Sequence, residues 1–234
     1  MRRDMDVTTN NIANASTTGF KSERVVFESY IQGDPTSNDS TNYVLDTGSY
    51  LDERQGSIGH TGNPLDVALQ GPGWFAYRTE QGQMAYGRDG RLNINAQGQL
   101  VTLNGAKILD SAGSPIAVPP DQVAGVMISE DGTISAAGIG TVGVIGVFDL
   151  QDLQSFERIG GGMFVRPEGR DEVALVPDMN TVVTQGAVEG SNVQPVIEIT
   201  RMMTIQKAYD RSLKLIGAED ELRQETLRRL GRTT

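Results

Sequence analysis

The C-terminal part of the chain carries a long helical pattern that constrains the fold more than any other feature. From Ile199 to Leu230, steps of three and four residues alternate, which is typical of the seam of a coiled coil. Such a helix would be about 54 Å long, whereas a compact chain of this length would be roughly 45 Å across. The pattern therefore predicts packing against other helices. The seam positions, mostly apolar, are Ile199, Met202, Gln206, Tyr209, Leu213, Ile216, Asp220, Arg223, Leu227 and Leu230.

A shorter helical pattern lies at the other end of the chain, over residues 1–15. Its apolar positions Met5 and Ile12 are expected to pack on the C-terminal helix. The Asn-, Ser- and Thr-rich run that follows is typical of a helix end, because these side chains compete for backbone hydrogen bonds. Gly19 can then adopt a positive φ. The C-terminal helix is expected to have Pro195 in its first turn, where a missing N–H costs nothing.

The middle of the chain reads as β structure. Short apolar runs are separated by Gly-containing turns, which predict an antiparallel meander that forms a barrel or a sandwich. Trp74 and Phe75 are expected on opposite faces of one strand. The predicted organisation is a discontinuous helical assembly domain (1–32 and 186–234), an extended loop (33–56) and a β domain (57–185). The predicted hairpin turns are Asp89-Gly90, Gln97-Gly98, Asn104-Gly105, Ala112-Gly113 and Asp131-Gly132.

Charge and composition exclude several classes of function. The net charge is −10, and residues 197–234 hold eight basic and six acidic residues, so the remainder is at −12. An acidic body argues against nucleic acid as a partner. The tail could be read as a membrane-surface helix, but its charges alternate in sign as on a solvated coiled coil. There is no cysteine and no long apolar run, so we expect no membrane insertion and no ordinary cleaved signal peptide.

No set of residues suggests catalysis, a cofactor or a metal. The single histidine, His60, is expected to be structural, since a zinc site would need further His or Cys ligands. The glycines around Pro72 lack the spacing of a nucleotide-binding loop. A carboxylate pair or a calcium site could be formed from Asp66, Asp89 and Asp131. However, Asp89 and Asp131 precede glycine in predicted turns, where Asp is common for backbone reasons.

Four blocks of the sequence resemble, in order, the signatures of the flagellar rod and hook protein family. The first runs from Met5 to Lys21 and the last covers 185–193, with Glu198 after it. Between them lie Thr61–Phe75 and the two hairpins within 86–101. Together they extend over nearly the whole chain. The residues taken as the family signature are Asn11, Asn14, Gly19, Phe20 and Asn192.

The resemblance implies a structural, non-enzymatic subunit of the bacterial flagellum, in the rod that spans the periplasm. It implies copies of itself and other flagellar rod proteins as partners, and passage through the flagellar type III export apparatus without a cleaved signal. The terminal helices would form an inner tube with the β domain outside, and the first four signature residues would shape the turn after the first helix. The predicted assembly residues are Met5, Ile12, Ile199, Met202, Tyr209, Leu213, Ile216 and Leu227.

Within the family, the short length and the stretch 189–195 are most similar to proximal-rod members. A distal-rod or hook member is the alternative. Family members usually have about a dozen further residues before the position of Met1, which form the first half of the N-terminal helix. Either the start of this sequence is misassigned, or this copy packs its N-terminal helix less completely. Two alternatives belong to other classes of function: a secreted carbohydrate-binding β module, and a cell-wall hydrolase, which would need a carboxylate pair with a raised pKa.

Overall fold

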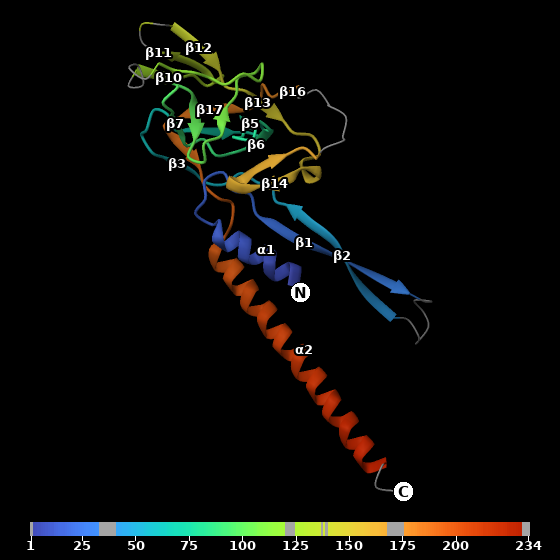
Figure 1. Cartoon of the computed structure of the whole chain (residues 1–234). Coiled ribbons are helices and arrows are strands. Elements are labelled where there is room, and N and C mark those ends of the chain that lie inside the picture. Colours follow the sequence, from blue (N-terminus) through green and yellow to red (C-terminus); the bar gives the residue numbers. More distant parts are fainter. Residues whose placement is uncertain are drawn as a thin grey trace. The chain divides into compact units, whose positions relative to one another are not determined.

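The computed structural model describes residues 2–32, 41–119, 125–136, 138, 140–167 and 176–230. It is mainly β with an α-helix near each end, which confirms the predicted fold class (Figure 1). The chain divides into two compact units. The terminal unit comprises Met1–Ala13, Glu23–Ser49 and Gln194–Thr234, and the β unit comprises Asn14–Ser22 and Tyr50–Val193.

The terminal unit contains two helices and a pair of strands. Helix α1 (Arg2–Ala13) packs on α2 (Pro195–Leu230) and on β1 (Glu23–Gln32), which pairs with β2 (Thr41–Leu51). Helix α2 begins at Pro195, as predicted, because proline has the right φ and needs no partner for its nitrogen at the first helical position.

Strand β2 corrects the prediction of an extended loop over 33–56. Residues 41–51 form a strand paired with β1, whereas the polar stretch 33–40 lies outside the described residues. The segment around Tyr43, Val44 and Tyr50 holds aromatic and β-branched residues that favour strands. Residues 33–42 are polar, but the residues after them favour a strand, so the prediction of a loop is wrong over 41–51.

The β unit is built around a nine-stranded sheet, in which β5 and β6 are central and β13 pairs with both β5 and β16. A three-stranded sheet and two strand pairs, β17–β4 and β18–β3, complete the unit. The strands of the large sheet are β5 (Trp74–Arg78), β6 (Met84–Gly87), β7 (Leu92–Ile94), β8 (Leu100–Thr102), β9 (Lys107–Ile108), β13 (Val147–Asp149), β14 (Glu157–Ile159), β15 (Met163–Val165) and β16 (Val176–Pro177). The others are β3 (Ile58–His60), β4 (Val67–Gln70), β10 (Val126–Ile128), β11 (Thr133–Ala136), β12 (Gly140–Val144), β17 (Val182–Gln185) and β18 (Ala187–Glu189), with short 3-10 helices at Leu153–Ser155 and Gly160–Gly162.

The core of the β unit lies on both faces of strand β5. Phe75 and Tyr77 belong to one buried apolar cluster, whereas Trp74 and Ala76 belong to another. This alternation confirms that Trp74 and Phe75 face opposite sides. The sheets are arranged as in a sandwich, and the described residues form no closed barrel. Of the two architectures predicted, the sandwich is correct.

Four of the five predicted hairpin turns are present. Gly98, Gly105, Gly113 and Gly132 all have positive φ at the ends of paired segments. The fifth prediction, at Asp89-Gly90, is wrong.

The strands on either side of Gly90, β6 and β7, are not neighbours in the sheet. Gly90 is required for a different reason. A Cβ at this position would lie 1.7 Å from the Val67 carbonyl oxygen, and the Gly90 carbonyl accepts a hydrogen bond from the Val67 N–H at 2.9 Å. The close approach of two backbones selects glycine here.

Candidate functional site

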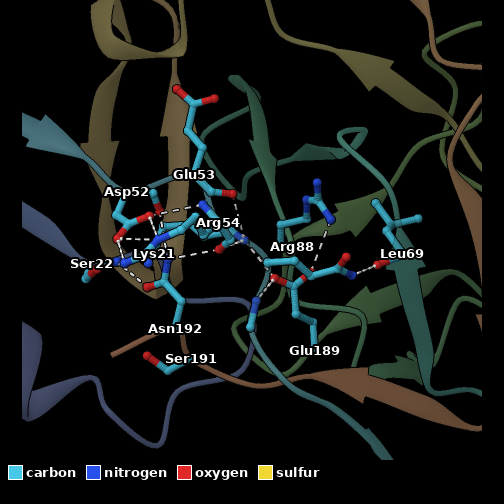
Figure 2. Close-up of polar contacts among 12 residues, drawn as sticks. Lys21, Ser22, Asp52, Glu53, Arg54, Leu69, Arg88, Glu189, Ser191 and Asn192 are labelled. Carbon is cyan, nitrogen blue, oxygen red and sulfur yellow. Dashed lines mark hydrogen bonds and ion pairs between the residues drawn. The ribbon is translucent and has the colours of Figure 1, made fainter. Parts of the chain in front are cut away.

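A buried cluster of charges joins four segments of the β unit (Figure 2). At its centre is Glu189, at the end of β18, whose side chain is almost fully buried. Its Oε1 accepts hydrogen bonds from Lys21 Nζ at 2.7 Å and from the Gly56 N–H at 2.9 Å. Its Oε2 accepts one from Arg88 Nη1 at 3.1 Å. The carboxylate therefore pairs with two cations that the fold removes from water.

The two cations have further partners in the same cluster. Lys21 Nζ donates to the carbonyl of Arg54 at 2.9 Å, and Arg88 Nη2 donates to the carbonyl of Gly71 at 2.6 Å. Both cations also lie near the Trp74 ring, at 5.8 Å for Lys21 and 5.0 Å for Arg88. Burial lowers the pKa of Lys21 and of Arg88, and the negative charge of Glu189 opposes this shift.

Asn192 ties the chain segment before α2 to two other segments of the β unit. Its Oδ1 accepts the Ser22 N–H at 2.7 Å, and its Nδ2 donates to the carbonyls of Asp52 at 2.7 Å and Arg54 at 3.0 Å. The Asn192 N–H donates to the Phe20 carbonyl at 3.2 Å. One amide side chain thus satisfies three backbone groups that no strand pairs.

Gly19 and Phe20 form the turn beside this cluster. Gly19 has φ +67°, and a Cβ there would lie 2.3 Å from the Arg88 carbonyl carbon, so no other residue fits without a shift of backbone. The Gly19 N–H donates to the Glu189 carbonyl at 2.8 Å. Phe20 is buried, with the guanidinium of Arg158 at 4.4 Å from its ring.

The other two signature residues lie at the end of α1 and just beyond it. In the terminal unit, Asn11 is buried, and its side chain donates to the Glu23 carbonyl at 2.8 Å and accepts the Glu23 N–H at 3.0 Å. It also donates to Glu198 of α2 at 3.4 Å. In the β unit, Asn14 accepts the Thr17 N–H through its carbonyl at 3.1 Å. Asn11 therefore holds together α1, β1 and α2.

Most predicted assembly residues on α2 are exposed. The side chains of Ile199, Tyr209, Leu213, Ile216 and Leu227 are between 48 and 69% exposed. Met5, Ile12 and Met202 are partly buried. Instead of the seam position Gln206, its neighbour Ile205 is buried, together with Glu198, and Arg201 pairs with Asp4 of α1 at 2.8 Å. The contact with α1 thus leaves most of the seam uncovered.

The candidate catalytic residues occupy separate, structural places. His60 ends β3 and is exposed. Asp66 accepts hydrogen bonds from Thr61 at 2.6 Å and Asn63 at 3.0 Å, and Asp89 accepts one from Thr18 at 2.6 Å. These hydrogen bonds stabilise turns and connecting segments, and this structural role accounts for the presence of both carboxylates.

Asp131 also belongs to a turn, between β10 and β11. Hydrogen bonds from Ser129 and Thr133 lower its pKa, the opposite of what a general acid needs. Within the described ranges, no three His, Cys, Asp or Glu side chains are grouped so that they could hold a metal ion. In the same part of the chain, no helix has the length and apolar character to cross a membrane.

The charge cluster itself was missed by the sequence interpretation. Lys21, Arg88 and Glu189 all lie within the signature blocks, but they were not chosen as site residues. The available signal was that Lys21 and Glu189 each lie within two residues of a glycine, Gly19 and Gly190. Nothing in the sequence indicates that residues separated by 168 positions, Lys21 and Glu189, meet.

Comparisons with known proteins agree with the resemblance. Three family models match: the flagella basal body rod protein model over residues 2–21, the flagellar hook protein FlgE/F/G D1 domain over 68–136, and the flagellar basal body rod FlgEFG protein C-terminal model over 184–229. The last two include most of the β unit's central strands and nearly all of α2.

Curated relatives cover almost the whole chain. The flagellar basal-body rod protein FlgF of Caulobacter vibrioides is 36% identical over 99% of this chain and 94% of its own length. FlgF of Salmonella typhimurium is 33% identical over 92% of this chain and 87% of its own length. FlgG of Agrobacterium fabrum is 31% identical, over 94% and 90%. The chain therefore belongs to the flagellar basal-body rod protein family, as a FlgF-like structural component of the rod.

Proposed function

We propose that this chain is an axial subunit of the proximal part of the periplasm-spanning flagellar rod. It assembles there through α1 and α2 with copies of itself and with other rod proteins, after passage through the flagellar type III export apparatus. The similarity to FlgF proteins over nearly the full chain supports the proximal position. Similarity to FlgG proteins makes a distal position the alternative.

The exposed seam of α2 is the observation that carries the proposal. A helix of 36 residues is longer than the 12-residue α1 can cover. From Leu213 to Leu230, every leucine and isoleucine is at least half exposed. Burying such side chains is worth about 1.5–3 kcal/mol each. This apolar surface favours association with further helices over a solitary subunit.

The position in the rod can be tested in cells that lack the gene for this chain. Basal bodies isolated from these cells should stop at a short, incomplete rod, because subunits that add later have no surface to bind. Protein identification should then find neither distal-rod nor hook subunits. A rod that lacks only its distal segment, or a complete rod that lacks only the hook, would move the chain to the distal-rod or hook alternative, and normal flagella would contradict a rod function.

The role of the seam can be tested by complementing the same cells with single variants. Leu213→Asp should abolish swimming and remove the chain from isolated basal bodies, because a charge on the seam cannot be buried without a partner. Lys214→Asp is the matched control, with the same new residue on the charged flank of the helix. Normal assembly of Leu213→Asp would contradict the assignment of the seam.

A further inference from the structure

The β unit contains a pocket of about 460 Å³ in the region of β12, β13, β16 and β17 (Figure 1). Apart from Ser111, its lining comes from the turn between β10 and β11, from the segment 144–147 and from the segment 177–183. All of these residues belong to the β unit. The lining residues Ile145 and Val183 are buried members of the apolar core. The floor of the pocket is therefore continuous with the core, and its volume is in the range of binding pockets.

Exposed apolar side chains gather at the mouth of this pocket. Val144, Met179 and Val182 all line it, and they are 37, 94 and 38% exposed. Clustered apolar exposure marks contact sites, whereas single exposed apolar residues are ordinary. A methionine side chain also adapts readily to a surface that covers it. Because Met179 extends into solvent, an occupant that covers it is larger than the pocket. This favours a polypeptide over a small molecule.

The charged residues of the pocket all have the same sign. Glu130, Asp131 and Asp178 line it, and no Lys or Arg lines it in the part of the chain that the structure describes. The backbone carbonyl of Glu130 accepts the Val183 N–H at 2.9 Å, which ties this residue to the floor. Glu130 and Asp131 are exposed, and the hydrogen bonds of its turn lower the pKa of Asp131, so that it is ionised at neutral pH. The rim is therefore negative.

The charge of the whole β unit has the same sign. Its residues 14–22 and 50–193 hold nine Lys and Arg and 17 Asp and Glu, which gives a net charge of −8. A second β unit would bring the same charge to the pocket and would be repelled. A cationic partner is attracted, and the field of the unit also raises its rate of association.

We propose that this acidic pocket, defined by Glu130, Asp131 and Asp178 around the floor of Ile145 and Val183, docks a basic and apolar polypeptide segment of another protein. An apolar side chain of the segment enters the pocket, and a Lys or Arg beside it pairs with Glu130 at the rim. The apolar contact provides affinity, and the charge selects the partner. The site lies in the β unit, so it is separate from the proposed assembly through α1 and α2.

Three labelled hexapeptides test the chemistry of the site by fluorescence anisotropy with the purified full chain. The first alternates lysine and valine, the second glutamate and valine, and the third lysine and serine. The lysine–valine peptide should bind, and the other two should bind about tenfold more weakly, because one lacks the positive charge and the other the apolar side chains. No saturable binding of the lysine–valine peptide would overturn the proposal, and so would equal binding of the lysine–serine peptide.

Glu130→Lys tests whether the peptide binds in the acidic pocket. This variant should weaken binding of the lysine–valine peptide about tenfold and narrow its advantage over the glutamate–valine peptide, because attraction at the rim becomes repulsion. Glu80→Lys is the matched control, since it makes the same change of charge at an exposed position that does not line the pocket. It should bind within about twofold of the wild type. Equal loss of binding in the two variants would mean that the peptide reads only the net charge.

A cysteine at the rim locates the bound peptide independently of charge, because the chain has no cysteine of its own. A lysine–valine peptide with a terminal maleimide should label Met179→Cys faster than Met127→Cys. Met127 is 69% exposed on β10 and does not line the pocket. Excess peptide without the maleimide should slow only the first reaction. Equal labelling rates would overturn the assignment of the pocket.

Sedimentation velocity tests the choice of partner. The wild-type chain and Glu130→Lys should show the same distribution of oligomers, because the pocket is proposed to bind another protein. If the wild type associates and Glu130→Lys alone dissociates, while Glu80→Lys behaves as the wild type, the occupant is a second copy and the choice of partner is overturned. Neither result changes the test of the rod position, which depends on basal bodies from cells.

Discussion

The two units of this protein differ in how far they bury their side chains. The β unit buries apolar residues on both faces of its central sheet and pairs Glu189 with Lys21 and Arg88 inside. The terminal unit leaves most apolar residues of α2 exposed. The β unit therefore has the contacts of a fold that is complete within one chain, whereas α2 has those of a helix that gains its packing from other subunits.

This comparison predicts that substitutions in the two units act on different measurements. The single tryptophan, Trp74, is buried beside the charge cluster, so its fluorescence reports on unfolding of the β unit. Far-ultraviolet circular dichroism reports mainly on α2. Assembly in cells is a third readout, and it should respond to the terminal unit without any loss of folded β unit.

The largest effect on stability is expected for Glu189→Gln. The variant keeps the shape of the side chain but leaves Lys21 and Arg88 buried without an anion, which costs about 3–5 kcal/mol. Urea unfolding followed by Trp74 fluorescence should show this loss. Glu219→Gln is the control, because it breaks the exposed pair with Arg223, which solvent screens. Equal midpoints for the two variants would show that the buried cluster does not stabilise the β unit.

Gly19→Ala should be the next most damaging change. The positive φ alone costs about 1–3 kcal/mol for a residue with a side chain, and the new Cβ would also meet the backbone of Arg88. Gly59→Ala, at a position with open space for a Cβ, should change the unfolding midpoint little. If both alanine variants unfold alike, the turn at Gly19 is less constrained than its contacts indicate.

Alkaline pH should weaken the β unit through Tyr77. Burial raises the pKa of this phenol well above 10, and its hydroxyl donates to the Asp89 carbonyl at 2.7 Å. Above pH 10 the unfolded chain loses this proton and the folded chain keeps it, so stability falls by about 1.4 kcal/mol per pH unit. Lys21 acts in the opposite direction, because its pKa is lowered and stability rises with pH towards 10.5.

Titration of the unfolding midpoint between pH 8 and 11 measures the balance of these two groups. Tyr77→Phe should start from a lower stability, since the Asp89 carbonyl loses its partner, but it should lack the fall above pH 10. If the stability of Tyr77→Phe falls above pH 10 as steeply as that of the wild type, the alkaline loss of stability arises from another group.

The smallest effect on folding is expected for Leu213→Asp, although it should have the largest effect on assembly. Leu213 is half exposed, and surface changes of this kind usually alter stability by less than about 0.5 kcal/mol. The Trp74 unfolding curve should match that of Lys214→Asp. A clear loss of β-unit stability would mean that the two units are coupled more strongly than their separate contacts indicate.

Local patterns in the sequence predicted a large part of the fold. The start of α2 at Pro195, four glycine turns and the opposite faces of Trp74 and Phe75 follow from short-range preferences, and all are present. The wrong prediction among the turns has a cause outside the local sequence. Asp89-Gly90 has the composition of a hairpin turn, but its glycine serves a close approach to Val67, a residue distant in the sequence.

Part of the candidate site could also be predicted from the sequence. The family signature and the heptad pattern of α2 are readable in the sequence, because repeat spacing and residue identity carry them.

The sequence by itself determined the long helix, the glycine-rich turns and the family, because each depends on residues close together in the chain. Only the tertiary structure decided that Glu189 meets Lys21 and Arg88, and that Asn192 joins the segments of Ser22 and Asp52. Such contacts depend on how distant segments are brought together. A charged residue looks the same in a sequence whether solvent or a buried partner surrounds it, and only packing distinguishes the two.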